Sequence, residues 1–269
     1  MNDEEDPFDF NGNLGNSNVN IIPGKRKKAS SGKGGPTTEQ FKNSESYSFA
    51  RERSLEFGGR SKWASGFKSG LSDIGHLMYA YCFNQIMASG RLIQEKDDEN
   101  DHGNRTIAVK NYPGALALIE FNEKHPFRSL VRFTKEIIFS PDKKTVTLNI
   151  REFISERDAR WVKKFYAMRF YLVIAQVADM AWVADSKSYQ PVVEYLEVLS
   201  KCTVSEWMVR NSTPVNVALE TSFDEPAFTL QGTAVVVAIG VEFATSAIMG
   251  QPSVNPGSGS LAIVGCFTE

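Results

Sequence analysis

The sequence predicts an α+β fold in which an antiparallel four-stranded sheet precedes a long capped helix, and a second half adds one helix and further antiparallel strands. Two segments, 129–139 and 145–154, alternate apolar and polar side chains, which is the period of a half-buried strand. The residues between them, Ser140-Pro141-Asp142-Lys143, have the composition of a tight turn. After Ser155, a predicted N-cap, apolar side chains from Ala159 to Ala181 recur at gaps of three and four, which predicts one long helix.

Residues 1–55 predict a disordered charged tail, and residues 56–269 a single α+β domain. The tail is rich in Asn, Gly, Ser and charged residues and lacks apolar periodicity, so ordering it would bury too little apolar surface to offset the entropy. We expect the domain to consist of two halves, at about 69–185 and 186–269, because the order of a helix and strands recurs.

The tail carries a short basic cluster, Lys25, Arg26, Lys27 and Lys28. Three interpretations remain open: a loose phosphate contact, an import signal where the host has a nucleus, or a solubilising run without a partner. Gly32-Lys33 is not a phosphate-binding loop, because the motif requires Ser or Thr after the lysine and Gly34 follows here.

Residues 51–68 are basic, with Phe57, Trp63 and Phe67 interleaved. Such a segment either grips a single strand, with stacked bases and neutralised phosphates, or docks the tail onto the core. Residues 72–89 predict a largely buried helix, in which we interpret His76 as a core residue rather than a ligand.

The segment before the opening strands completes the predicted sheet. Residues 95–104 form an acidic loop without the spacing of a calcium loop, so we expect no metal there. Residues 105–112 and 115–123 predict two further strands around the turn pair Pro113-Gly114.

The sequence of the second half predicts buried strands. Residues 234–241 are apolar on both faces, as expected of a central or interface strand. The complete set of expected elements is a helix at 189–200, strands at 203–211, 214–222, 227–230, 233–243 and 261–267, and a loop at 250–259. This half is acidic and apolar, which fits self-assembly better than binding to a polyanion, and we expect a homo-oligomer, a dimer or tetramer.

Composition limits the class of protein. No run of eighteen apolar residues exists, so we expect no membrane span, and the acidic start lacks the features of a signal peptide. The three cysteines, Cys82, Cys202 and Cys266, are far apart in apolar contexts and are expected to be reduced core residues. We therefore expect a cytoplasmic location, or a nuclear one if the basic cluster of the tail is an import signal.

Charge is strongly segregated along the chain. The net charge is −2, yet residues 124–169 hold twelve Lys and Arg against five Asp and Glu. The candidate phosphate contacts in this block are Lys124, Arg128, Arg132, Lys135, Lys143, Lys144, Arg151, Arg157, Arg160, Lys163, Lys164 and Arg169. Arg157, Arg160 and Lys164 would form one stripe on the predicted helix, while Phe153 or Tyr112, expected to be exposed, would stack bases.

The segment from Lys144 to Phe153, with the string Ile150-Arg151-Glu152-Phe153, resembles the hairpin strand of the positive-cofactor-type transcriptional coactivators. The plan of residues 105–185 is similar to that family and to the Whirly group, which bind single-stranded nucleic acid across a sheet and, for Whirly proteins, form tetramers. The resemblance implies nucleic-acid contacts from Arg151 and its strand neighbours. The chain departs from these families in lacking a second hairpin, in having Asn149 where the acid stands, and in lacking a Lys-Gly-Lys-Ala-Ala signature.

The sequence contains no catalytic constellation, and we expect neither an enzyme nor a cofactor. The three histidines, His76, His102 and His125, have no metal-ligand spacing, and no nucleophile elbow or dinucleotide fingerprint occurs.

Three functions remain. The first is a sequence-tolerant binder of single-stranded RNA or DNA, and the second is a viral structural subunit of a capsid, matrix or shell with a charged N-terminal arm. The third is a scaffold that binds another protein through acidic patches.

Overall fold

The structure is a computed structural model of the 269-residue chain. It describes residues 12–14, 17–19, 36–79, 81–117, 119–142, 144–161, 165–193, 200–224, 232–248 and 251–268. The chain divides into two compact units, Met1–Arg51 and Glu52–Glu269.

The first unit contains short elements. Strands β1 (Gly12–Leu14) and β2 (Ser17–Val19) pair antiparallel. Helix α1 (Thr38–Asn43) begins with a capping box, in which Thr37 and Gln40 each accept a hydrogen bond from the backbone N–H of the other. A short 3₁₀ turn, η1 (Glu45–Tyr47), leads into α2 (Ser48–Gly70).

The disordered tail expected over residues 1–55 therefore needs a correction. Residues 38–43 and 48–55 are helical, because Thr37 caps α1 and residues 48–55 are the first two turns of α2. The remainder of the expected tail lies outside the described residues, apart from residues 12–14, 17–19, 36–37 and 44–47.

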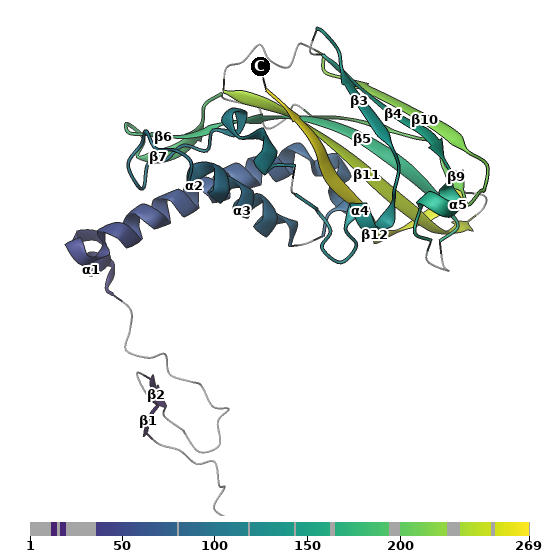
Figure 1. Cartoon of the computed structure of the whole chain (residues 1–269). Helices are drawn as coiled ribbons and strands as arrows, with labels where there is room; N and C mark the ends of the chain where they lie inside the picture. Colours follow the sequence, from purple (N-terminus) through teal and green to yellow (C-terminus); the bar gives the residue numbers. More distant parts are fainter. Residues whose placement is uncertain are drawn as a thin grey trace, which may run out of the picture. The chain divides into compact units, whose positions relative to one another are not determined.

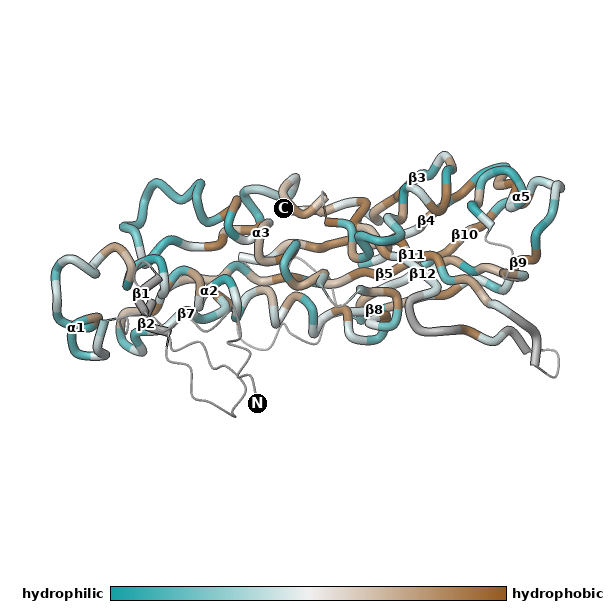
Figure 2. Tube along the Cα trace, turned by 90° about the horizontal axis from the view of Figure 1, so that it is seen from below, coloured by the Kyte–Doolittle hydropathy of each residue, from teal (hydrophilic) through white to brown (hydrophobic). Residues whose placement is uncertain are grey.

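The second unit is built on a large antiparallel sheet with the order β12-β11-β5-β8, to which β9 adds by pairing with β5. Its strands are β5 (Ala167–Ala178), β8 (Ser200–Val204), β9 (Met208–Val209), β11 (Thr233–Ile248) and β12 (Gln251–Phe267). Figure 2 shows hydrophobic residues following β5 and β11 through this unit. The expected doubly apolar strand is thus confirmed as the central strand β11.

Helices cover one face of this sheet (Figure 1). They are α2, the 3₁₀ segment η2 (Ser72–Leu77) and α3 (Cys82–Gln94). Trp63 and Leu77 pack there with Val236 and other alternate residues of β5 and β11 into one core cluster. Figure 1 also shows β6 (Met180–Val183) and β7 (Ser188–Pro191), which form a separate antiparallel hairpin.

A three-stranded antiparallel sheet, ordered β10-β4-β3, covers the opposite face (Figure 1). It consists of β3 (Lys135–Phe139), β4 (Thr145–Phe153) and β10 (Val215–Ser222). Val146, Leu148 and Ile150 are fully buried against the large sheet, as their alternation predicts. The predicted α+β class is therefore confirmed.

The predicted long helix after Ser155 is wrong. Helix α5 (Ser155–Asp158) has a single turn, and β5 follows it. The physical reason is that both faces of β5 are covered, so nearly every residue is apolar, and such a run satisfies the spacing of a helix as well as that of a strand.

Other predicted elements also differ. The segments at 105–112 and 115–123 form 3₁₀ turns, η3 (Val109–Asn111) and η4 (Pro113–Ala115), with isolated bridges instead of strands, so two of the four strands predicted before residue 155 do not form. The strand predicted at 129–139 begins only at residue 135, because residues 127–130 form a helical turn. The helix at 72–89 is interrupted between η2 and α3, and the loop at 250–259 is the first part of β12, where β11 supplies the hydrogen bonds.

In the second half, the helix expected at 189–200 does not begin as predicted, because residues 188–191 are strand β7. Residues 194–199 lie outside the described residues. The strand at 203–211 is divided between β8 and β9, and the one at 227–230 lies outside the described residues. The strands at 214–222, 233–243 and 261–267 are confirmed within β10, β11 and β12.

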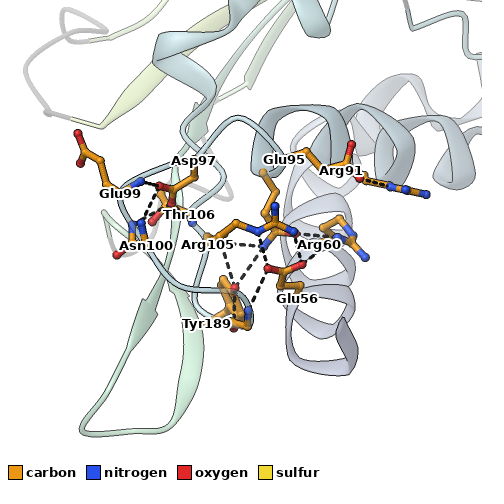
Figure 3. Close-up of polar contacts among 12 residues, drawn as sticks. Glu56, Arg60, Arg91, Glu95, Asp97, Glu99, Asn100, Arg105, Thr106 and Tyr189 are labelled. Atoms are coloured by element: carbon orange, nitrogen blue, oxygen red, sulfur yellow. Dashed lines mark hydrogen bonds and ion pairs between the residues drawn. The ribbon is translucent and has the colours of Figure 1, made fainter. Parts of the chain in front are cut away.

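A buried polar cluster ties α2 and α3 to the loop at 97–106 (Figure 3). Glu56, 2% exposed, accepts hydrogen bonds from Nε and Nη2 of Arg105 at 2.6 and 2.8 Å and from the N–H of Gly103 at 3.0 Å. Gln94 donates to the carbonyl of Arg105 at 2.7 Å, and the hydroxyl of Tyr189 donates to that of Gly103 at 3.0 Å. Sequence patterns did not indicate this cluster, because its members come from four separate segments.

Candidate nucleic-acid interface

The segment leading into β3 turns its cations outward because its apolar residues anchor it. Helix α4 (Phe127–Leu130) is one turn long, and Phe127, Leu130 and Val131 are buried in the core. Arg128 and Arg132, which lie between and beside these anchors, are directed away from it, and Arg128 is exposed. An isolated bridge between Val131 and Ala159 holds this segment in place.

This segment forms one wall of a cleft of about 360 Å³, and β12 forms the other. Strands β3 and β12 are each at an edge of their sheet, and a contact between the rings of Phe139 and Phe267, 5.0 Å apart, joins them. The cleft, called the basic cleft below, is lined by Ala117, Phe127, Arg128, Val131, Arg132, Phe133, Lys135, Ala262, Ile263 and Val264. Its lining therefore combines apolar side chains with three cations.

The cations of the basic cleft differ in their partners. Arg128 makes an ion pair of 3.5 Å with Glu120, which also accepts a hydrogen bond from the N–H of Phe127. No acidic side chain in the described part of the chain lies within ion-pair distance of Arg132 or Lys135. These two cations are thus available to an anionic ligand.

A second, more open hollow of about 320 Å³ adjoins the basic cleft at Lys135. It is lined by Thr134, Lys135, Glu136, Asn149 and Arg151. Arg151 donates to Glu136 across the strands at 3.1 Å, and both side chains are exposed. This ion pair is worth little in water, so Arg151 can exchange its partner for a phosphate at small cost.

The outer face of the small sheet is polar but not basic. Thr147, Asn149 and Arg151 lie on this face, in agreement with the alternation of residues 145–154. Glu136 and Glu220, on the neighbouring strands, lie on it as well, because they pair with Asn149 and Thr147. The expected concentration of positive charge is therefore at the β3 edge and not on the face.

The other candidate contacts are dispersed. Arg157 is paired through two hydrogen bonds with Asp158, and these raise the pKa of the guanidinium above its usual value. Arg160 is exposed beside Leu130, whose carbonyl accepts its N–H at 2.7 Å, and Lys144 is half-buried in the turn between β3 and β4. Arg157 and Arg160 do not share a stripe on a long helix, because α5 ends at Asp158. The candidates outside the described residues are Lys25, Arg26, Lys27, Lys28, Lys143, Lys163 and Lys164.

Arg169 is occupied within the fold. Its Nε and Nη2 donate to the carboxylate of Glu242 at 2.8 and 2.7 Å, and Glu242 is only 2% exposed. The hydroxyl of Tyr171 donates to the same carboxylate at 2.7 Å, and burial and this hydrogen bond raise the pKa of Tyr171. His76 Nε2 lies 3.0 Å from the carboxylate, and its side chain is 39% exposed, so the interpretation of His76 as a core residue is wrong.

The expected stacking residues do not serve the basic cleft. Phe153 is fully buried, because a bulge with positive φ at Glu152 turns it back into the core. Tyr112 is exposed, but it lines a different hollow with Asp97, Asp98 and Glu99. Two aromatic residues line the cleft, Phe127 and Phe133. Sequence patterns did not indicate either as a ligand contact, since the alternation of residues 129–139 indicated only that Phe133 faces inward.

Comparison with protein-family models, curated proteins and solved structures finds no match. The resemblance to the Whirly and positive-cofactor-type families stays a prediction. Among the described residues no helix is long and apolar enough to cross a membrane, and no group of three or more His, Cys, Asp or Glu could hold a metal ion.

Proposed function

We propose that the protein is a non-enzymatic, sequence-tolerant binder of single-stranded RNA or DNA, and that the basic cleft holds the strand. The observation that carries this proposal is the pair Arg132 and Lys135, two cations beside a cleft of about 360 Å³ with no described acidic partner. Uncompensated cations at a concave surface attract a polyanion even when the net charge is slightly negative.

The neighbouring hollow extends the same track. Lys135 lines both hollows, and Arg128 and Arg151 lie on either side of it. The ion pairs of Arg128 and Arg151 are formed by exposed guanidinium groups, so a phosphate can replace each carboxylate. These four cations, three at the β3 edge and Arg151 on the adjoining face of β4, would contact successive phosphates without reading the sequence.

A second candidate function is an assembly subunit, favoured by exposed aliphatic side chains at the opposite edge of the large sheet. Val204 on β8 and Val209 on β9 are 38% and 54% exposed. However, β11 gives no reason to expect an oligomer, because the layers of the chain itself cover both of its faces. Self-association stays a prediction that light scattering at micromolar concentration would test.

The binding proposal is tested by fluorescence anisotropy with a labelled single-stranded oligonucleotide at several salt concentrations. Arg132→Ala with Lys135→Ala should weaken binding and flatten the slope of log K against log salt by about 0.7 for each phosphate that the variant no longer neutralises. The matched control is Arg91→Ala with Lys96→Ala, which removes the same two charges from exposed positions at the end of α3. Equal affinity of the cleft variant and the parent would overturn the proposal, as would equal weakening in the control.

A further inference from the structure

We propose that Phe133 in the basic cleft seats one unpaired nucleobase, so that the ligand is a strand with bases and not any flexible polyanion. This inference rests on the proposed function and assigns a base contact to the same site. The phosphate contacts at Arg132 and Lys135 would place the backbone at the rim, and the base would enter the cleft.

The lining of the cleft carries the first argument. A site for phosphate alone needs only cations and N–H donors, yet Phe127, Val131 and Phe133 line one wall and Ala262, Ile263 and Val264 the other. A volume of about 360 Å³ lies within the range of sites that bury small organic ligands. Apolar side chains beside three cations fit a ligand with a flat apolar ring and a phosphate.

The arrangement of rings around Phe133 carries the second argument. Phe133 meets Phe127, Phe153 and Phe170 edge-on, with interplanar angles of 88°, 87° and 76°. Among the described residues no ring stacks parallel on Phe133, whereas Phe165 and Phe243 stack with an angle of 17°. Phe133 packs only partly into the core and lines the cleft, so part of its ring is open to a ligand there.

The surroundings also hold Phe133 in a fixed orientation. Three edge-on contacts restrict its ring before a ligand arrives, so binding costs little side-chain entropy. A duplex cannot use this seat, because its bases are paired and stacked within the helix. The cleft should therefore prefer single strands to duplexes of the same charge.

The experiment compares a labelled single-stranded oligonucleotide with one of equal length whose central positions are abasic, and with polyphosphate. The base-bearing strand should bind tighter than the abasic strand by about 5- to 150-fold, the range for one base stacked on an aromatic ring. Phe133→Leu should abolish this difference and leave the salt slope unchanged. The control is Phe139→Leu, another partly buried phenylalanine of the same edge, which lies outside the lining of the cleft.

A second measurement does not depend on a variant that folds. With 2-aminopurine at a central position, the parent protein should change the fluorescence of the base, because the base leaves the stack of its neighbours for Phe133. Equal affinity for the base-bearing and abasic strands without a change in fluorescence would overturn the base seat. Salt-dependent binding of both strands would in that case leave the proposed function intact, whereas failure to bind either strand would overturn both.

Discussion

The guanidinium of Arg105 donates two hydrogen bonds, of 2.6 and 2.8 Å, to the carboxylate of Glu56, which lies 49 residues earlier in the sequence. Burial by itself would raise the pKa of Glu56, but the hydrogen bonds from Arg105 and the N–H of Gly103 outweigh it and lower the pKa. The pair therefore holds the loop at 97–106 against α2 with a charged carboxylate at neutral pH (Figure 3).

Removing the charge of Glu56 should destabilise the protein strongly. We expect Glu56→Gln to cost about 3 kcal/mol at pH 7, because it leaves the largely buried Arg105 without its counter-ion. In the parent, the lowered pKa of Glu56 stabilises the fold at pH values above the pKa that Glu56 has in the unfolded chain. This stabilisation is lost as pH falls through the pKa of Glu56 in the folded state. Urea unfolding at pH 7 and in the acid range measures both effects. Arg91→Ala, which breaks the exposed pair with Glu95, should cost less than about 1 kcal/mol.

Two adjacent glycines of α2 should respond in opposite directions to alanine. A Cβ at Gly59 would lie 2.5 Å from the ring of Tyr189, so Gly59→Ala should destabilise by about 1–3 kcal/mol. A Cβ at Gly58 would meet nothing within 4 Å, so Gly58→Ala should stabilise the helix by about 0.5–1 kcal/mol. Thermal unfolding of the two variants checks the pair. Equal shifts of Tm would contradict this packing of Tyr189 on α2.

Asp179 should make stability depend on pH. Burial raises the pKa of its carboxyl to about 6, although hydrogen bonds from the N–H groups of Lys110 and Val109 oppose the change. The folded state binds the proton of Asp179 more tightly than the unfolded chain does. The contribution of Asp179 to the free energy of unfolding therefore falls as pH rises between about 4 and 6.

The variant Asp179→Asn should remove that dependence, because an amide does not titrate in this range. Its side-chain oxygen still accepts the N–H of Lys110, so this hydrogen bond is kept. The gain in unfolding free energy should be small at pH 4 and reach about 3 kcal/mol at pH 7.5. Guanidinium unfolding at both pH values measures it. A gain of the same size at both would show that the carboxyl does not titrate in this window.

Neighbouring residues of β4 should separate stability from binding. Ile150→Ala, in the core, should cost about 2–5 kcal/mol of unfolding free energy through a cavity. Arg151→Ala, on the exposed side, should change stability by less than about 0.5 kcal/mol but weaken the binding of the oligonucleotide. Denaturant unfolding and anisotropy on the same preparations compare them. A stability loss in the Arg151 variant similar to that of the Ile150 variant would mean that the ion pair with Glu136 is structural.

Truncation should define where the second unit begins. A chain that starts at Ser48 should unfold cooperatively, because it retains Glu56, Trp63 and Phe67, which α2 buries. A chain that starts at Gly70 should lose cooperative unfolding, since it lacks these three side chains. Circular dichroism during heating distinguishes the two. Cooperative unfolding of the shorter chain would show that α2 is dispensable.

The sequence by itself determined the elements whose side chains alternate strictly. One face of β4 is buried and the other faces outward. The alternation of apolar and polar residues, as at Val146 and Thr147, therefore predicts which side chains are buried without knowledge of any partner strand. The same holds for the apolar run of β11, which can only lie in the interior. The concentration of cations between residues 124 and 169 is likewise a property of the sequence.

Tertiary structure decided the rest. The apolar run of β5 fits a helix and a strand equally, and it is a strand because helices cover one face and the small sheet the other. Residues 251–254 and Gly259 belong to β12 because they pair with β11, which local turn composition cannot predict. The basic cleft exists only because packing brings Phe133 and Ile263, far apart in the sequence, to the same site, and no local period encodes such a distance.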